Sequence, residues 1–340
     1  GPGIQMSQRA MNVLRALGLE EQLRDIAFRP EHQLSRDWDT GHVNLDYPFG
    51  DVAEKRYGAP YLLMHRGDLH ALLTATVPAG RIHRGKKLVG LTHLDCGARL
   101  DFEDGSVVEP DAVIAADGVH SFIREHMFGR EHPTYSGRVA YRTTFPAALL
   151  KAPIDDCTKW WGKDRHIVIY YTTRAKDEVY FVTSVPESAW TEESWSLKAS
   201  TDELRQAFVG FHPIVTDVLA VCPQVNKWAI FEREPMPSWT KGNVVLIGDA
   251  CHPMTPYMAQ GAATAMEDAA VLARCLDGVD RSGVHAAFKT FEGARKERTA
   301  QIQLVSHQNV WLHRSGNTDW VFGYDAWQAP LTEARVANAG

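Results

Sequence analysis

The stretch Val244–Asp268 (VVLIGDACHPMTPYMAQGAATAMED) constrains the fold of this chain more than any other segment. Its apolar start predicts a buried strand that ends at Gly248-Asp249, and a proline-rich loop then leads to a helix that opens at Gly261-Ala262. Glycine lets a backbone approach a ligand closely, and ligands of open α/β sheets bind at the carboxyl ends of strands. The free N–H groups at the start of a helix favour an anionic oxygen. A tight corner without a ligand would explain any one of these residues, but the occurrence of all of them in this order favours a ligand site.

A second corner of the same kind follows Asp111–Ala116, which is almost wholly apolar and fits a strand buried on both faces. This strand runs into Asp117-Gly118, and a helix follows; an ordinary turn capped by Ser121 is the alternative. Arg66 stands at the end of another short strand, where a guanidinium can meet phosphate oxygens. Taken alone, Arg66 would be read as a solvated arginine.

The middle of the chain differs from both ends. Residues 139–186 are rich in aromatic and β-branched side chains and predict a second sheet, with strands at 167–173 and 179–185. Amphipathic spacing predicts a helix over 7–17, and a long helix over 284–313 whose charged residues 292–298 form a solvated face. We therefore expect a nucleotide-type domain in two parts, 1–135 and 236–340, interrupted by a sheet domain at 136–235 that can cover a ligand site.

Composition excludes several classes of protein. The formal charge of −6 argues against a nucleic-acid-binding surface, and no apolar run is long enough to cross a membrane. No signal peptide is visible. The five cysteines include no C-x-x-C pair, which argues against a disulfide framework or a structural metal site. Reduced cysteines in a cytoplasmic protein are the favoured interpretation, and monomer and homodimer both stay open.

The D-G corner, the G-D corner and Arg66 together resemble those of the flavin-dependent aromatic hydroxylases with a p-hydroxybenzoate hydroxylase-like fold. The resemblance implies an α/β chain in which a mostly β substrate domain interrupts a Rossmann-like FAD-binding domain, with helices at the C-terminus. It also implies FAD as cofactor, NADH or NADPH as co-substrate, and O2. By resemblance, the cofactor-binding residues are Arg66, Leu88, Asp117, Gly118, Gly248, Asp249, Gly261 and Ala262.

Within this family, Cys157–Ser184 is similar to members that hydroxylate and decarboxylate a hydroxypyridine carboxylate such as 6-hydroxynicotinate. The resemblance implies that His166 and Tyr170 bind the pyridine carboxylate and assist catalysis, and that Cys157 is a substrate-binding residue. Four residues apart on a strand, His166 and Tyr170 share one sheet face. Without the resemblance, both would be ordinary sheet residues satisfied by water, and Cys157 a small buried hydrophobic residue.

The chain departs from this pattern in its substrate residues and at its start. Gln5 and Tyr257, expected to contact substrate, stand where the family members carry histidines. These two residues keep open a salicylate-type hydroxylase or a hydroxylase of another phenol.

The start of the chain also differs. The family opens with a strand and G-x-G-x-x-G, which this sequence lacks, so we expect that roughly 40 residues forming the first βα unit are missing. That absence also motivates a non-enzyme alternative, a flavin-free binding protein.

Overall fold

The structure is a computed structural model that describes residues 2–188, 190 and 197–331. The chain divides into two compact units. The first comprises 1–76, 134–231 and 310–323, and the second comprises 77–133, 232–309 and 324–340. Among the described residues, no helix combines the length and the apolar character that a membrane span requires.

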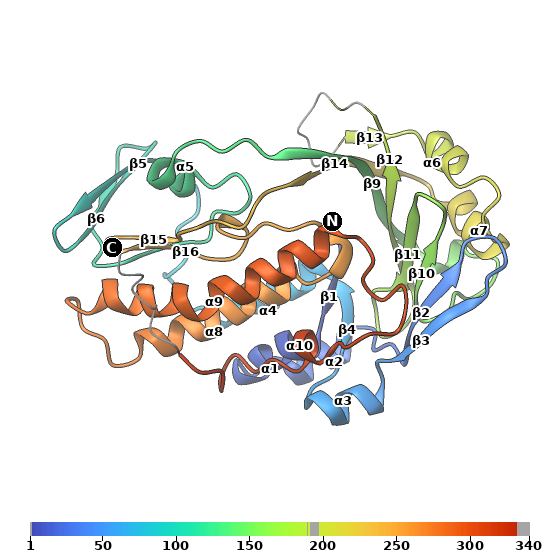
Figure 1. Ribbon diagram of the computed structural model, residues 1–340, viewed down its shortest axis with the longest axis horizontal. Coiled ribbons are helices and arrows are strands. Elements are labelled where there is room, and N and C mark those ends of the chain that lie inside the picture. The colour runs from blue at the N-terminus through green and yellow to red at the C-terminus, as the bar shows by residue number, and fades with distance from the viewer. Residues whose placement is uncertain (1, 189, 191–196, 332–340) are drawn as a thin grey trace, which may run out of the picture. The chain divides into compact units, whose positions relative to one another are not determined.

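The first unit is built on an eight-stranded sheet (Figure 1). β10 pairs antiparallel with β11 and parallel with β2. The two strands predicted from the aromatic and β-branched pattern are confirmed as β11 and β12. In spatial order the strands are β13 (Leu197–Ala199), β14 (Val225–Glu232), β9 (Thr134–Pro146), β12 (Glu178–Pro186), β11 (His166–Tyr171), β10 (Cys157–Trp161), β2 (His32–Asp37) and β3 (Val43–Pro48).

Two helices cover one face of this sheet. Trp160 points to that face and stacks on His212, the N-cap of α7, at a centroid distance of 5.1 Å. Phe208 and Phe211, which join α6 to α7, pack edge to face beside them. Because strand residues alternate between faces, the neighbours of Trp160 on β10 point to the opposite face.

The remaining elements of the first unit surround a short antiparallel pair, β1 (Gly3–Met6) with β4 (Leu62–His65). The helix predicted over 7–17 is confirmed as α1, which has Ser7 as N-cap and ends before Gly18 in the left-handed region. The helices are α1 (Gln8–Ala16), α2 (Glu20–Ile26), α3 (Asp51–Tyr57), α4 (Arg66–Thr76), η1 (Ala147–Leu149), α6 (Thr201–Ala207), α7 (Pro213–Val221) and α10 (Asp319–Phe322).

In the second unit, β8 and β16 are parallel neighbours in a three-stranded sheet. Their carboxyl ends therefore meet at one edge, which brings the D-G and G-D corners together. The strands are β5 (Leu88–Leu94), β6 (Gly97–Phe102), β7 (Val107–Val108), β8 (Val113–Ala115), β15 (Thr240–Lys241) and β16 (Val244–Leu246). The helices are α5 (Phe122–Phe128), η2 (Gly248–Ala250), η3 (Pro256–Met258), α8 (Gly261–Leu276) and α9 (Val284–His307).

Two expectations for this unit are wrong in detail. Ile114 is 45% exposed, so the strand that it occupies is not buried on both faces; β8 is an edge strand of its sheet as described. The long helix ends at His307 rather than near 313, because Asn309 adopts a positive φ of 53°. Asparagine tolerates this left-handed conformation better than most residues and commonly ends helices.

Candidate active site

The face of the large sheet opposite α6 and α7 gathers the predicted substrate residues. Trp161 on β10 pairs with His166 on β11, and Thr158 pairs with Ile169. By alternation, Cys157 and Trp161 on β10 share this face with His166 and Tyr170 on β11. All four side chains are buried or nearly so. The structure thus brings together three of the residues expected to act on substrate.

At one end of this face, Gln5 joins two tyrosines. The Tyr61 hydroxyl donates to Gln5 Oε1 at 2.7 Å, which leaves the amide N–H groups of Gln5 for the Tyr170 hydroxyl. Burial raises the pKa of Tyr170 well above its usual range, while the Gln5 contact opposes that shift. Tyr170 therefore stays a neutral phenol that can donate a hydrogen bond. Gln5, Tyr61 and Tyr170 thus lie in one hydrogen-bond network.

Cys157 lies beside this network as a protonated thiol. Its Sγ donates to Gln33 Oε1 at 3.0 Å, and the side chain is fully buried. Burial raises the pKa of the Cys157 thiol far above its usual value. The charge of Lys159 opposes this shift, but burial outweighs it, and a protonated thiol is a poor nucleophile. Cys157 can therefore shape the site as a small buried side chain.

At the other end of the face, His166 is held in its neutral form. Its ring lies 5.2 Å from that of Trp161. Burial lowers the pKa of His166 well below its ordinary value, and the nearby charges of Lys159 and Arg138 act in the same direction. A neutral imidazole can accept a hydrogen bond or a proton from an acidic ring hydroxyl.

In the second unit, the G-D corner is a tight turn that requires glycine. Gly248 has a positive φ of 57°, and a Cβ there would lie 3.2 Å from the Cβ of Ala265. Its N–H donates to Asp268 Oδ2 at 3.0 Å. Asp249 is exposed at the end of β16, where its carboxylate is free to accept hydroxyl hydrogen bonds. A glycine is therefore needed for the turn that presents Asp249.

Asp268 anchors this corner through a buried network. Its Oδ2 also lies 2.5 Å from His252 Nε2, and its Oδ1 accepts from Arg295 Nε at 2.9 Å. Cys251, His252 and Asp268 have ligand atoms within 4.8 Å of one another. Because Asp268 already has both oxygens engaged, hydrogen bonds explain this cluster without a metal ion. The opposing charges of Arg295 and His252 lower the pKa of Asp268 to about 2 against its burial.

The expectation of a solvated helix face at 292–298 is wrong. Arg295 has no exposed surface, and its guanidinium also pairs with Glu267 at 2.6 Å. Glu292 is likewise buried and accepts from the Trp239 N–H at 2.9 Å. These contacts connect α9 to the chain that carries the G-D corner. The charges are buried because each one meets a partner from another segment.

At the D-G corner, the Asp117 carboxylate caps a helix. Its Oδ2 accepts from the Ile123 N–H at 3.1 Å, and Ser121 Oγ accepts from the Arg124 N–H at 2.9 Å. Gly118 has a positive φ of 79°. The capped turn considered from the sequence is therefore present, and one Asp117 oxygen is used in it.

Arg124 was missed by sequence reasoning and links the two corners. Its guanidinium donates to the Val119 carbonyl at 2.6 Å and to the Ala250 carbonyl at 3.0 Å. The residue is 4% exposed. A strand–turn–helix pattern carries no signal for such a contact, because the partner lies more than a hundred positions away.

The other predicted residues fall in both units. Arg66 begins α4 in the first unit, where its charge acts on Tyr180. Leu88 begins β5 in the second unit. Gly261 and Ala262 open α8, whose first N–H groups have no partner within the helix. Tyr257 is buried in η3 of the second unit.

These features fit the cofactor expected from the sequence. FAD carries ribityl hydroxyls, a pyrophosphate and a flavin edge that becomes negative on reduction. The exposed Asp249 carboxylate suits the hydroxyls, and the left-handed turn at Gly248 presents it at the end of β16. The N-terminus of α8 suits a negative flavin edge.

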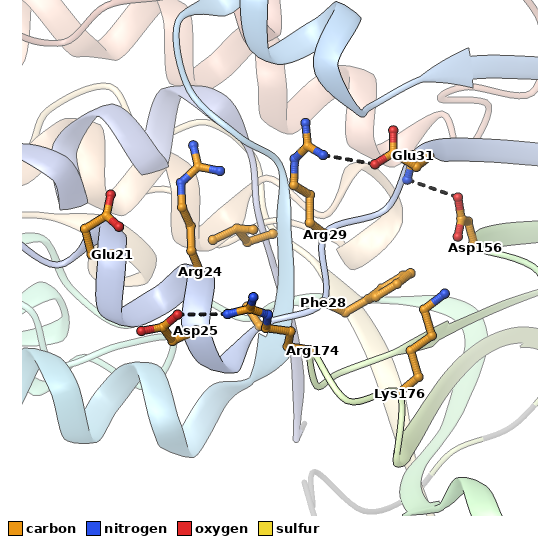
Figure 2. Close-up of a pocket in the computed structure, with 11 residues that line it drawn as sticks. Glu21, Arg24, Asp25, Phe28, Arg29, Glu31, Asp156, Arg174 and Lys176 are labelled. Carbon is orange, nitrogen blue, oxygen red and sulfur yellow. Dashed lines mark hydrogen bonds and ion pairs between the residues drawn. The ribbon is translucent and has the colours of Figure 1, made fainter.

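A cavity of about 550 Å³ in the first unit contains none of these residues. Figure 2 shows that it is lined largely by charged side chains, several of which pair with one another. Arg174 meets Asp25 at 2.9 Å, and Arg29 meets Glu31 at 2.9 Å. Such internally paired charges offer little to an aromatic substrate, so this cavity is distinct from the candidate site.

The fold and the two corners fit an FAD-dependent aromatic hydroxylase, and the comparisons show that class. The FAD binding domain family matches residues 3–305, and the chain belongs to that family. It is an oxidoreductase that uses FAD and NAD(P)H as an aromatic monooxygenase, with the p-hydroxybenzoate hydroxylase-like fold.

Two relatives and one solved structure show which members of this class the chain resembles. The chain is 46% identical to 6-hydroxynicotinate 3-monooxygenase of Bordetella bronchiseptica, over 100% of this chain and 89% of that protein. It is 44% identical to the enzyme of the same name from Pseudomonas fluorescens, with the same coverage. A solved salicylate hydroxylase substrate complex shares the fold with a TM-score of 0.83 and 24% identity, over 96% of this chain and 89% of that one.

Proposed function

We propose that this enzyme hydroxylates a hydroxypyridine carboxylate such as 6-hydroxynicotinate, with loss of the carboxylate as CO2. The observation that carries the proposal is the single sheet face holding His166, Tyr170 and Cys157. Side chains of these types can form hydrogen bonds with the hydroxyl and the carboxylate of an aromatic ring. The similarity to two 6-hydroxynicotinate 3-monooxygenases supports the same substrate class.

In the proposed mechanism, the protein orients and polarises the ring. FAD held at the two corners would supply the redox chemistry, in which NADH or NADPH is oxidised, one oxygen atom of O2 goes to the ring and the other leaves as water. The neutral His166 accepts a hydrogen bond from the substrate and, with Tyr170, polarises the ring. Tyr170 donates a hydrogen bond that fixes the position of the ring. If the attacked carbon carries the carboxylate, CO2 leaves from it.

Within this proposal, Gln5, Cys157 and Tyr257 contact the substrate or its immediate surroundings. Asp117, Gly118, Gly248, Asp249, Gly261 and Ala262 hold FAD, together with Arg66 and Leu88. The proposed domain limits remain 1–135 and 236–340 for FAD and 136–235 for substrate. All five cysteines are free, which fits a cytoplasmic enzyme. Light scattering on the purified protein separates monomer from homodimer.

A substrate panel tests the proposal. The flavin-loaded enzyme is supplied with NADH and, in turn, with 6-hydroxynicotinate, salicylate and other hydroxybenzoates, and the products are identified. We expect 6-hydroxynicotinate to be consumed in step with NADH. Consumption of salicylate instead would favour the salicylate-type alternative that Gln5 and Tyr257 leave open.

A further inference from the structure

One row of residues crosses the candidate substrate face and includes a buried lysine that the sequence did not single out. The strand register pairs Lys159 with Val168 and Val168 with Val182. Lys159 also pairs with Ser35 on β2, and Val182 pairs with Arg142 on β9. Lys159 therefore points to the same face as Cys157 and Tyr170.

The environment of Lys159 lacks a counter-ion. The residue is 5% exposed, and within the described part of the chain no carboxylate lies within ion-pair distance of its ammonium. Its Nζ lies 4.0 Å from the centroid of the Trp161 ring, a cation–π contact that offsets part of the desolvation cost. Burial lowers the pKa of Lys159 to about 7. An anion placed beside this amine would restore its charged form.

The neighbours of Lys159 match the outline of a small aromatic acid. Val168 is only half-buried and offers an apolar surface for a ring. His166 and Tyr170 flank Val168 on its own strand at roughly 7 Å, and Lys159 lies across from it at roughly 5 Å. A six-membered ring on Val168 therefore has groups on three sides that recognise its polar substituents.

Arg142 is the other cation of this row, but it is placed differently. Its guanidinium stacks over the Trp228 ring at 3.6 Å, and two strands separate β9 from β10. Lys159 and Arg138 are the two cations whose charges act on the His166 ring. The Arg138 guanidinium already donates to Ser184 Oγ and to the carbonyls of Asp164 and Ser184. Lys159 is thus the nearer partner for an anionic group on a ring that His166 and Tyr170 hold.

We propose that Lys159 binds the carboxylate of the substrate and so determines the preference of the enzyme for an acid. This inference rests on the proposed function, because it requires an aromatic acid on the sheet face. It adds a charged partner for the carboxylate beside His166 and Tyr170, and the neighbours of Lys159 on β10, Cys157 and Trp161, frame the same site.

The test compares an acid with its neutral amide. Binding of 6-hydroxynicotinate and of 6-hydroxynicotinamide to the flavin-loaded enzyme is measured by calorimetry for the wild type, Lys159→Met and Lys159→Arg. We expect Lys159→Met to bind the acid about 10- to 100-fold more weakly and the amide almost unchanged. Lys159→Arg keeps the charge and retains most of the preference for the acid. Lys163→Met, which removes an exposed lysine nearby, is the control and should change neither constant.

Equal binding of both ligands to Lys159→Met and wild type would overturn the proposal, as would an equal loss of both. Should Lys159→Met fail to fold, Lys159→Gln gives the same comparison with a polar side chain. If wild type binds salicylate but not 6-hydroxynicotinate, the proposed substrate is wrong. Salicylate and salicylamide then replace the first pair, and Lys159 is judged on their ratio.

Discussion

The Arg124 guanidinium donates a hydrogen bond to the main-chain carbonyl oxygen of Ala250 at 3.0 Å. A second hydrogen bond to the Val119 carbonyl, at 2.6 Å, holds the other corner. Arg124 is buried and donates to main-chain oxygens, so its contacts fix backbone positions rather than side chains. The two corners that carry the cofactor motifs are therefore held together by one side chain.

Replacing Arg124 should weaken FAD binding before it affects substrate recognition. Arg124→Met leaves buried carbonyl oxygens unpaired, and we expect the FAD dissociation constant to rise about 10-fold. Flavin fluorescence titration of the apoprotein measures this change. Arg130→Met, at an exposed arginine of the same unit, is the control and should bind FAD like wild type. Unchanged FAD affinity in Arg124→Met would contradict the linking role.

Tyr170→Phe should impair hydroxylation more than FAD content. The variant loses the hydroxyl that meets Gln5 and that we place against the substrate, so the turnover rate should fall on the order of 100-fold. Product formation per bound flavin measures the effect. Tyr171→Phe is a matched control, because Tyr171 lies on the opposite face and its hydroxyl accepts from the Ile154 N–H. A parallel loss of flavin in Tyr170→Phe would make Tyr170 a structural residue.

Asp249→Ala should show the reverse pattern and lose FAD first. The exposed carboxylate at the end of β16 is placed to accept hydroxyl hydrogen bonds, and its removal should weaken FAD binding about 10- to 100-fold. Asp249→Asn keeps an acceptor oxygen and should lose less. The flavin-to-protein absorbance ratio after dialysis reports the difference. Full flavin content in Asp249→Ala would remove Asp249 from the cofactor site.

Because of Asp268, the free energy of unfolding should depend on pH in the acid range. Its pKa falls from 3.8 to about 2 in the folded protein, so its ionised form stabilises the fold above pH 4. This stabilisation, about 2 kcal/mol, is lost as the pH falls from about 4 to about 2. Urea unfolding of wild type and Asp268→Asn should therefore differ most at neutral pH and converge near pH 2. A difference independent of pH would show that the charge of Asp268 does not act this way.

Local patterns predicted the local structure well. The apolar run before Gly248, the proline-rich loop and the start of α8 at Gly261 all occur where the sequence placed them. Alternation along β11 placed His166 and Tyr170 on one face, because a strand has a fixed period of two. These predictions needed only neighbours in the sequence.

Contacts between distant segments were not predictable in this way. Arg295 looked like part of a solvated face because its own helix is rich in charge, but Glu267 and Asp268 arrive from α8 and bury it. Lys159 drew no attention for a similar reason. Its lack of an ion-pair partner among the described residues depends on which strands, β2 and β11, lie at either side of β10.

Oxygen-isotope labelling tests the central claim most directly. Flavin-loaded enzyme, NADH and 6-hydroxynicotinate are incubated under ¹⁸O2, and the pyridine product, CO2 and hydrogen peroxide are measured together. The account predicts one labelled oxygen atom in the ring product and one CO2 for each NADH oxidised. Oxidation of NADH that yields hydrogen peroxide and leaves 6-hydroxynicotinate unchanged would contradict it.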